Sequence, residues 1–219
     1  MSDPRFAVVG FPRGAELRRR LPRFLAGLPC LGVGIAMTLE ARLGVSPFDV
    51  LHQGLARKTG LSFGTVVIGV GIVILLLWIP IRQPFGIGTV LNTLTVGLII
   101  DAALHFLPEP DALAWRWPLL LGGIVVTGLG TGLYIGAGLG PGPRDGLMTG
   151  IAGRGHRLWV VRTVIELAAL VAGWTLGGNA GVGTVIFAFG IGPVAQFFLN
   201  RFHLGVAAGT DLGPGVSAE

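Results

Sequence analysis

The sequence is poor in charged residues and in cysteine. Only 12% of its 219 residues are Asp, Glu, Lys or Arg, whereas 52% are hydrophobic and the mean hydropathy is +0.76. Soluble domains carry about twice this share of charge, so the composition excludes an ordinary soluble fold. The single cysteine, Cys30, excludes an internal disulfide framework. The histidines show no metal-ligand spacing and no Ser, His and Asp set marks a nucleophile, so we expect no cofactor, no metal and no enzymatic activity.

The net charge of +5 does not indicate a nucleic-acid partner, because the basic residues lack the pattern of such a surface. Five arginines precede the first apolar run with no aromatic residues interleaved: Arg13, Arg18, Arg19, Arg20 and Arg23. We expect them to contact anionic lipid and to keep the N-terminus on the cytoplasmic side.

Six apolar runs are close to the ~20 residues that a transmembrane helix needs. Three are uncharged, at residues 61–81, 117–139 and 181–199, and three carry a few charges, at residues 25–43, 85–107 and 158–176. The sequence therefore predicts an all-α, multi-pass protein whose main partner is the lipid bilayer.

One block of the sequence occurs twice, displaced by 96 residues. Between residues 32 and 56, 10 of 25 positions are identical in the second copy, where composition alone gives about one in ten. A second signature, Gly-x-Gly-Thr-Val, occurs at residues 86–90 and 181–185. The duplication predicts an arm at residues 1–24, a first membrane repeat at 25–107, a connecting loop at 108–118, a second repeat at 119–200 and a tail at 201–219.

The short segments 47–58 and 143–154 decide the expected topology. Each holds 12 residues, which reach ~18 Å as a helix and do not cross a ~30 Å hydrocarbon core. Three spans per repeat turn the second copy upside down, so we expect an inverted pair about an axis in the membrane plane. Loop charges, with Arg144 counted among them, do not separate this topology from one in which the short segments also cross.

Each short segment carries the residues of a helix start. Ser46, Pro47 and Asp49 suit the N-cap, first and third positions, and the second segment repeats the pattern with Gly142 as cap and Asp145 as carboxylate. On one interpretation each Asp caps a short helix at the membrane interface. On the other, both helices are re-entrant and their N-termini face a central cavity that binds a solute. The two interpretations are compatible.

The Leu-Gly-x-x-Pro-x-Asp blocks at residues 43–49 and 139–145, together with the Gly-x-Gly-Thr-Val signatures, resemble the YczE/YitT-type family of bacterial membrane proteins. The resemblance covers almost the whole membrane region. It implies a protein of the bacterial cytoplasmic membrane and supplies no substrate, because the family is largely uncharacterised. The first block has Ser46 where the second has Gly142, so the two caps need not bind alike.

Polar side chains within spans are the remaining candidates, because burying a charge in lipid costs several kcal/mol. Asp101 faces either a cavity or the interface. Arg162 and Glu166 lie four residues apart on one helical face, where they either form an ion pair or couple transport to protons. Asn92 lies mid-span, where it either binds solute or bridges helices.

A stripe of glycine recurs at every fourth residue of the fourth span: Gly128, Gly132, Gly136 and Gly140. Such small-residue faces let another helix approach closely. We expect this face to pack within the chain, with a homodimer interface as the alternative.

These features favour a small-solute transporter or permease whose site lies at the repeat interface. The alternative is a membrane scaffold that regulates a partner system and transports nothing. A polar cavity bounded by both Pro-x-Asp segments distinguishes the first from the second.

Overall fold

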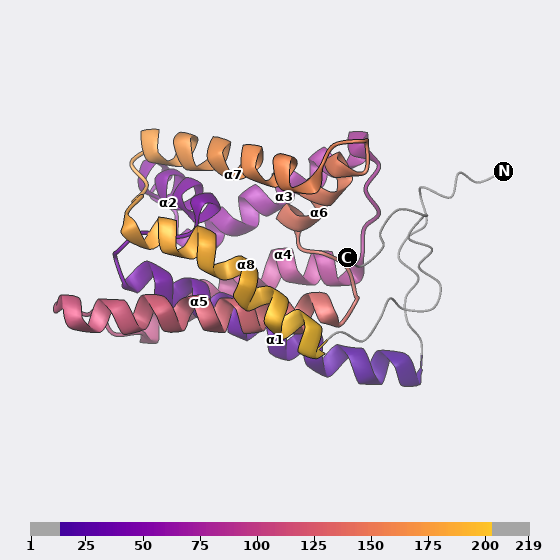
Figure 1. Cartoon of the computed structure of the whole chain (residues 1–219), viewed down its shortest axis with the longest axis horizontal. Helices are drawn as coiled ribbons and strands as arrows, with labels where there is room; N and C mark the ends of the chain where they lie inside the picture. The colour runs from indigo at the N-terminus through magenta and orange to yellow at the C-terminus, as the bar shows by residue number, and fades with distance from the viewer. Residues whose placement is uncertain (1–13, 203–219) are drawn as a thin grey trace.

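The computed structural model describes residues 14–202. Within that range the chain forms eight α-helices and no β-strand (Figure 1). The helices are α1 (Ala15–Glu40), α2 (Pro47–Thr59), α3 (Phe63–Ile81), α4 (Ile87–Phe106), α5 (Leu113–Gly136), α6 (Pro143–Ala152), α7 (Leu158–Thr175) and α8 (Val182–Phe202).

Six of these helices are long and apolar enough to cross a bilayer: α1, α3, α4, α5, α7 and α8. They match the six expected spans, so the prediction of an all-α, multi-pass protein is confirmed. Two bounds differ from the expected domains, because α1 already begins at Ala15 within the predicted arm and α5 begins at Leu113 within the predicted connecting loop. Residues 1–13 and 203–219, which hold the rest of the arm and most of the tail, lie outside the described residues.

One arginine of the expected lipid anchor is buried in the protein. Arg20 is only 4% exposed, its Nη1 donates to the carbonyl of Ala137 at 2.8 Å, and its Nη2 lies 2.9 Å from Glu16. Ala137 is the C-cap of α5, where carbonyl groups lack helical partners and favour a cation. The expectation of a lipid contact is therefore wrong for Arg20, which joins α1 to the end of α5.

The two short helices begin where the capping pattern predicts. In α2 the Ser46 hydroxyl accepts the backbone N–H of Asp49 at 3.1 Å and Pro47 occupies the first turn. In α6 Pro143 follows Gly142, which offers no side-chain cap. With 13 and 10 residues, α2 and α6 are too short to cross a ~30 Å core.

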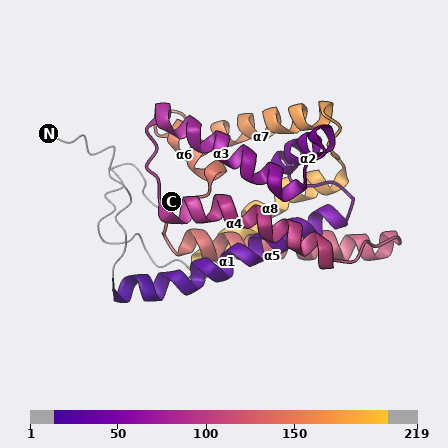
Figure 2. The same cartoon turned by 180° about the vertical axis from the view of Figure 1, so that it is seen from behind.

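Long helices α1 and α5 cross through glycine at the centre of the fold. Gly27 of α1 faces Gly130 of α5, and Gly34 faces Gly123, so neither pair leaves room for a side chain. The pairs run in opposite order along the two helices, which makes α1 and α5 antiparallel. Figures 1 and 2 show α4 running alongside α1, and α8 alongside α5, while α2 and α6 lie near opposite ends of α7.

Two hydrogen bonds connect the halves in a reciprocal way. The N–H of Gly88, at the start of α4, donates to the carbonyl of Leu139 at 3.0 Å, and the N–H of Gly183, at the start of α8, donates to Leu43 at 2.8 Å. The first Gly-x-Gly-Thr-Val signature thus packs on the segment before α6, and the second packs on the segment before α2. The docking fixes α2 and α6 relative to the long helices.

The glycine stripe packs within the chain. Gly128 lies against Val194 and Gly132 against Phe198, both on α8. Van der Waals packing of this kind drives helix association in lipid. Gly140 meets Thr89 and Gly86 at the start of α4. Because α8 covers Gly128 and Gly132, these two positions are not available to a second copy for the alternative homodimer through Gly128, Gly132, Gly136 and Gly140.

Candidate functional site

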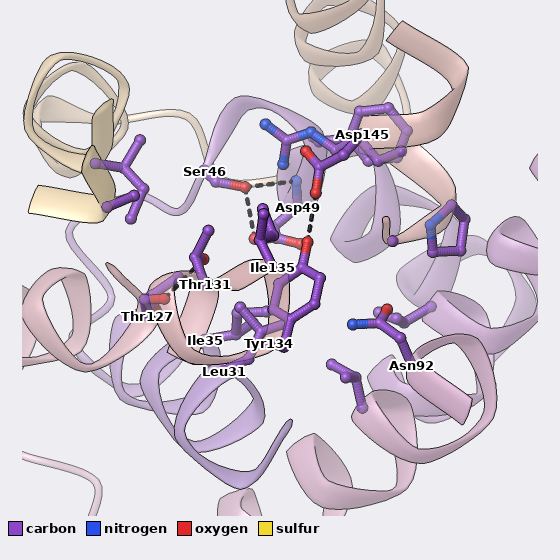
Figure 3. A pocket seen from close by; sticks show the side chains of 18 of the residues that line it. Leu31, Ile35, Ser46, Asp49, Asn92, Thr127, Thr131, Tyr134, Ile135 and Asp145 are labelled. Carbon is purple, nitrogen blue, oxygen red and sulfur yellow. Dashed lines mark hydrogen bonds between the residues drawn. The ribbon is translucent and has the colours of Figure 1, made fainter. Parts of the chain in front are cut away.

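A cavity of about 310 Å³ lies between the N-termini of the two short helices. The N-terminal residues of α2 and α6 both line it, including Ser46, Asp49, Gly142 and Asp145. The rest of the lining comes from α1, α3, α4, α5, α7 and α8 and is largely apolar (Figure 3). Pockets of ~300 Å³ and more, apolar with a few convergent polar groups, are typical of small-molecule sites.

On the α2 side of the cavity, the Asp49 carboxylate is fully engaged by its own helix. Ser46 Oγ donates to Asp49 Oδ2 at 2.5 Å, and His52 Nδ1 lies 3.0 Å from Asp49 Oδ1. Asp49 is 6% exposed. The sequence analysis considered His52 only as a metal ligand, although its position three residues after Asp49 places the two side chains on one helical face.

On the α6 side, the Asp145 carboxylate is held from a different helix. Tyr134 of α5 donates its hydroxyl to Asp145 Oδ2 at 2.5 Å. Gly142 stands where Ser46 stands in α2, so no cap hydroxyl reaches this carboxylate. Tyr134 is the single tyrosine of the chain, and that rarity inside a span is the signal that could have identified it.

Arg144 connects three helices at the wall of the cavity. Its guanidinium forms an ion pair with Glu166 of α7 and lies 5.2 Å from the centroid of the Phe48 ring of α2. Phe48 is the residue 96 positions earlier, so the two equivalent positions contact each other. The sequence analysis treated Arg144 as a loop charge; a charge in only one of two duplicated blocks was the signal available to find it.

The charged residues predicted within the spans lie in different places and have different partners. Glu166 pairs with Arg144 and not with Arg162, while Arg162 lines the cavity. Asp101 lies away from the cavity, where its carboxylate accepts the N–H of Gly64 at 2.7 Å and the hydroxyl of Ser62 at 2.5 Å. Asp101 therefore caps the N-terminus of α3, which is a structural role.

Three buried polar atoms of cavity-lining residues lack a hydrogen-bond partner within the described residues: Asn92 Nδ2, Thr127 Oγ1 and Arg144 Nε. Thr127 Oγ1 faces Gly34 where α1 and α5 pack together. Buried polar groups are almost always satisfied, so the amide of Asn92, which is only 7% exposed, is a candidate contact for a bound solute or water. In residues 14–202 no group of three or more His, Cys, Asp and Glu side chains is arranged to hold a metal ion.

Six long apolar helices define a multi-pass membrane protein, and a cavity lies between the N-termini of its two short helices. Residues 18–200 match the model of a family of unknown function, DUF6198, so the chain belongs to that family. It is 41% identical over 177 residues to an uncharacterized protein of Haemophilus influenzae, covering 80% of this chain and 81% of that one.

Two relatives come from Bacillus subtilis. The uncharacterized membrane protein YczE is 36% identical over 190 residues, covering 85% of this chain and 88% of YczE. The uncharacterized protein YyaS is 31% identical over 166 residues, covering 73% of this chain and 82% of YyaS. The resemblance read from the duplicated motifs is confirmed. No solved structure matches the chain.

Proposed function

We propose that this protein is a small-solute transporter whose binding site is the cavity between the N-termini of α2 and α6. The observation that carries the proposal is a cavity that is bounded by both Pro-x-Asp helices and receives polar groups from each of them. Burying an unpartnered polar atom such as Asn92 Nδ2 in a membrane domain costs free energy, and a rigid scaffold would gain nothing in return. Half-helices that meet near the centre of a membrane domain are characteristic of secondary transporters.

The two halves form an inverted repeat in this proposal. Antiparallel crossing of α1 and α5 through equivalent glycine pairs supports a two-fold relation, because Gly27 and Gly34 correspond to Gly123 and Gly130 at the offset of 96. The reciprocal hydrogen bonds of Gly88 and Gly183 support it independently. α2 packs on α7 of the other half, and α6 packs on α3.

Access to the cavity lies between α7 and α8. The corresponding helices of the first half, α3 and α4, pack closely against each other, whereas α7 and α8 make few or no contacts. Exposed polar side chains from both helices line this side of the cavity, Arg162 from α7 and Gln196 from α8. In an inverted repeat, closing this side while α3 and α4 separate opens the cavity to the opposite face, which is alternating access.

We also propose that the protein lies in the bacterial cytoplasmic membrane with its N-terminus inside. The basic residues at the start of α1, Arg18, Arg19 and Arg23, support this orientation through the positive-inside rule.

Transport is tested with purified protein in liposomes and a panel of labelled ions, amino acids, amines and small metabolites. We expect uptake of at least one class by the wild type, and loss of that uptake in Asp49→Asn and Asp145→Asn. The matched control is Asp111→Asn, which changes an exposed carboxylate outside the cavity. If no solute enters the liposomes and a partner protein co-purifies instead, the scaffold and regulator interpretation replaces this one.

A further inference from the structure

The two short helices differ at the cap position, which is Ser46 in α2 and Gly142 in α6. This difference affects whether the neighbouring carboxylate can accept a hydrogen bond from a ligand. In α2, the hydroxyl of Ser46 occupies the space beside Asp49 and donates to it at 2.5 Å. In α6, Gly142 lines the cavity and has no hydroxyl to donate to Asp145, and the equivalent space is closely bordered by polar groups. A Cβ at Gly142 would lie 3.2 Å from the hydroxyl of Tyr134, 3.4 Å from Asn92 Oδ1 and 3.6 Å from Asp145 Oδ2.

The polar groups around this space have unused hydrogen-bonding capacity. Asp145 receives one hydrogen bond, from Tyr134, whereas Asp49 receives one on each oxygen. Asn92 Nδ2 is buried with no acceptor, while the amide oxygen of the same side chain faces Gly142. Figure 3 shows Asn92 directed from α4 toward the cavity that Tyr134 and Asp145 border. The space therefore suits a group that donates to Asp145, carried by a ligand that also offers an acceptor to Asn92.

Charge determines which donor fits. The cavity and the ion pair at its wall hold three carboxylates and two guanidinium groups, which leaves one negative charge when His52 is neutral: Asp49, Asp145 and Glu166 against Arg144 and Arg162. The Nη2 of Arg144 is paired with Glu166, and its Nε is buried with no hydrogen-bond partner among residues 14–202. An unbalanced carboxylate within a membrane is costly, so a ligand with a single positive charge is favoured over a neutral or anionic one.

We propose that the space beside Gly142 binds the protonated amine of a small amino alcohol, which donates to Asp145 as the hydroxyl of Ser46 donates to Asp49. The hydroxyl oxygen of the ligand accepts from Asn92 Nδ2. This assignment rests on the proposed function only in that the bound ligand is taken to be the transported solute. A bare metal cation fits less well, because residues 14–202 present no group of three acidic, His or Cys ligands.

The test is calorimetric binding to the purified full chain in detergent micelles, with four probes of similar size. 2-Aminoethanol carries both groups, propylamine lacks the oxygen, ethylene glycol lacks the charge, and glycolate reverses it. We expect 2-aminoethanol to bind about tenfold more tightly than propylamine or ethylene glycol, with no binding of glycolate. Equal binding of ethylene glycol, binding of glycolate, or no binding of 2-aminoethanol overturns the proposal.

Variants locate the site. Gly142→Ser fills the space with the hydroxyl found in α2, so it weakens 2-aminoethanol binding by at least about tenfold while the helix start is preserved. Gly153→Ser, at the other end of α6 where a Cβ meets only ordinary contacts, is the matched control and leaves binding unchanged. Unchanged binding in a folded Gly142→Ser overturns the proposal.

A second variant keeps the test decisive if Gly142→Ser fails to fold. Asn92→Leu lowers 2-aminoethanol binding to the level of propylamine and leaves propylamine binding unchanged; an undiminished preference for 2-aminoethanol overturns the proposal. Flux separates this inference from the proposed function. Binding of 2-aminoethanol without uptake of any solute into liposomes refutes transport alone, whereas uptake of a neutral or anionic solute without amine binding refutes the ligand class alone.

Discussion

The ion pair between Arg144 and Glu166 can be replaced by the residues that the first half itself uses. At the offset of 96, Arg144 corresponds to Phe48 and Glu166 to Val70. Arg144→Phe and Glu166→Val therefore introduce side chains that already occur at equivalent positions of the fold. The two single variants and the double variant form a thermodynamic cycle.

The magnitudes follow from burial and from the charges that remain. Removing one partner of a fully buried pair costs about 3–5 kcal/mol, but the side chain of Arg144 is 29% exposed and that of Glu166 is 13% exposed. We therefore expect Arg144→Phe to lower the free energy of unfolding by about 2–3 kcal/mol and Glu166→Val by about 1–2 kcal/mol. Arg144→Phe costs more because it leaves Asp49, Asp145 and Glu166 with one arginine fewer. Glu166→Val costs less because Arg144 still interacts with Asp49 and Asp145.

The double variant should recover most of the loss, because an apolar pair of similar volume is about as stable as a buried ion pair. Thermal unfolding of the purified proteins in detergent measures this, with a shift of about 2–4 °C per kcal/mol for a chain of this size. We expect both single variants to melt below wild type and the double variant to melt above Arg144→Phe. A double variant that melts as low as the sum of the single losses refutes the claim that the two side chains stabilise each other.

Three further predictions test other parts of the structure. With Cys30 replaced by Ser, Lys58→Cys and Arg154→Cys, which are equivalent exposed positions, should react with a membrane-impermeant thiol reagent from opposite faces of the cell membrane; reaction from the same face contradicts the inverted repeat. Gly34→Val should lower the free energy of unfolding by about 1–3 kcal/mol in a melting experiment, because α5 leaves no space for a side chain there. Asp101→Ala should cost about 1–3 kcal/mol of stability through the lost cap of α3 and leave 2-aminoethanol binding unchanged; weaker binding would show that Asp101 acts on the cavity.

Sequence reasoning was most successful where one local pattern decides the structure. Hydropathy fixes the six long helices, since a bilayer requires about 20 apolar residues whatever their partners. The order of cap, proline and acid fixes the starts of α2 and α6, since those interactions lie within one helical turn. Both features depend on neighbours in the sequence and on no tertiary contact.

Side-chain contacts between different helices could not be predicted from the sequence as well. An ion pair of Glu166 with Arg162 was one of two alternatives, because both lie on one helix, but Arg144 of α6 is the residue that approaches Glu166 through tertiary packing. Asp101 was assigned either to a cavity or to the interface, and its real partners, the start of α3 with Gly64, lie 37 residues away in the sequence. Helical periodicity alone carries no information on which distant helix end a carboxylate will meet.

Differences between the duplicated blocks are more informative about chemistry than their identities. Identical residues such as Asp49 and Asp145 stand in the first turn of both short helices, where an acidic residue is favoured whatever the chemistry of the cavity. The exchanges of Ser46 for Gly142 and of Phe48 for Arg144 need a different explanation, because either residue is compatible with the same backbone. Both exchanges line one cavity: the first frees the carboxylate of Asp145 and the second supplies a cation that Glu166 holds. In the proposed transporter, an asymmetric solute bound between two related halves needs unlike groups from each half, and these exchanges would provide them.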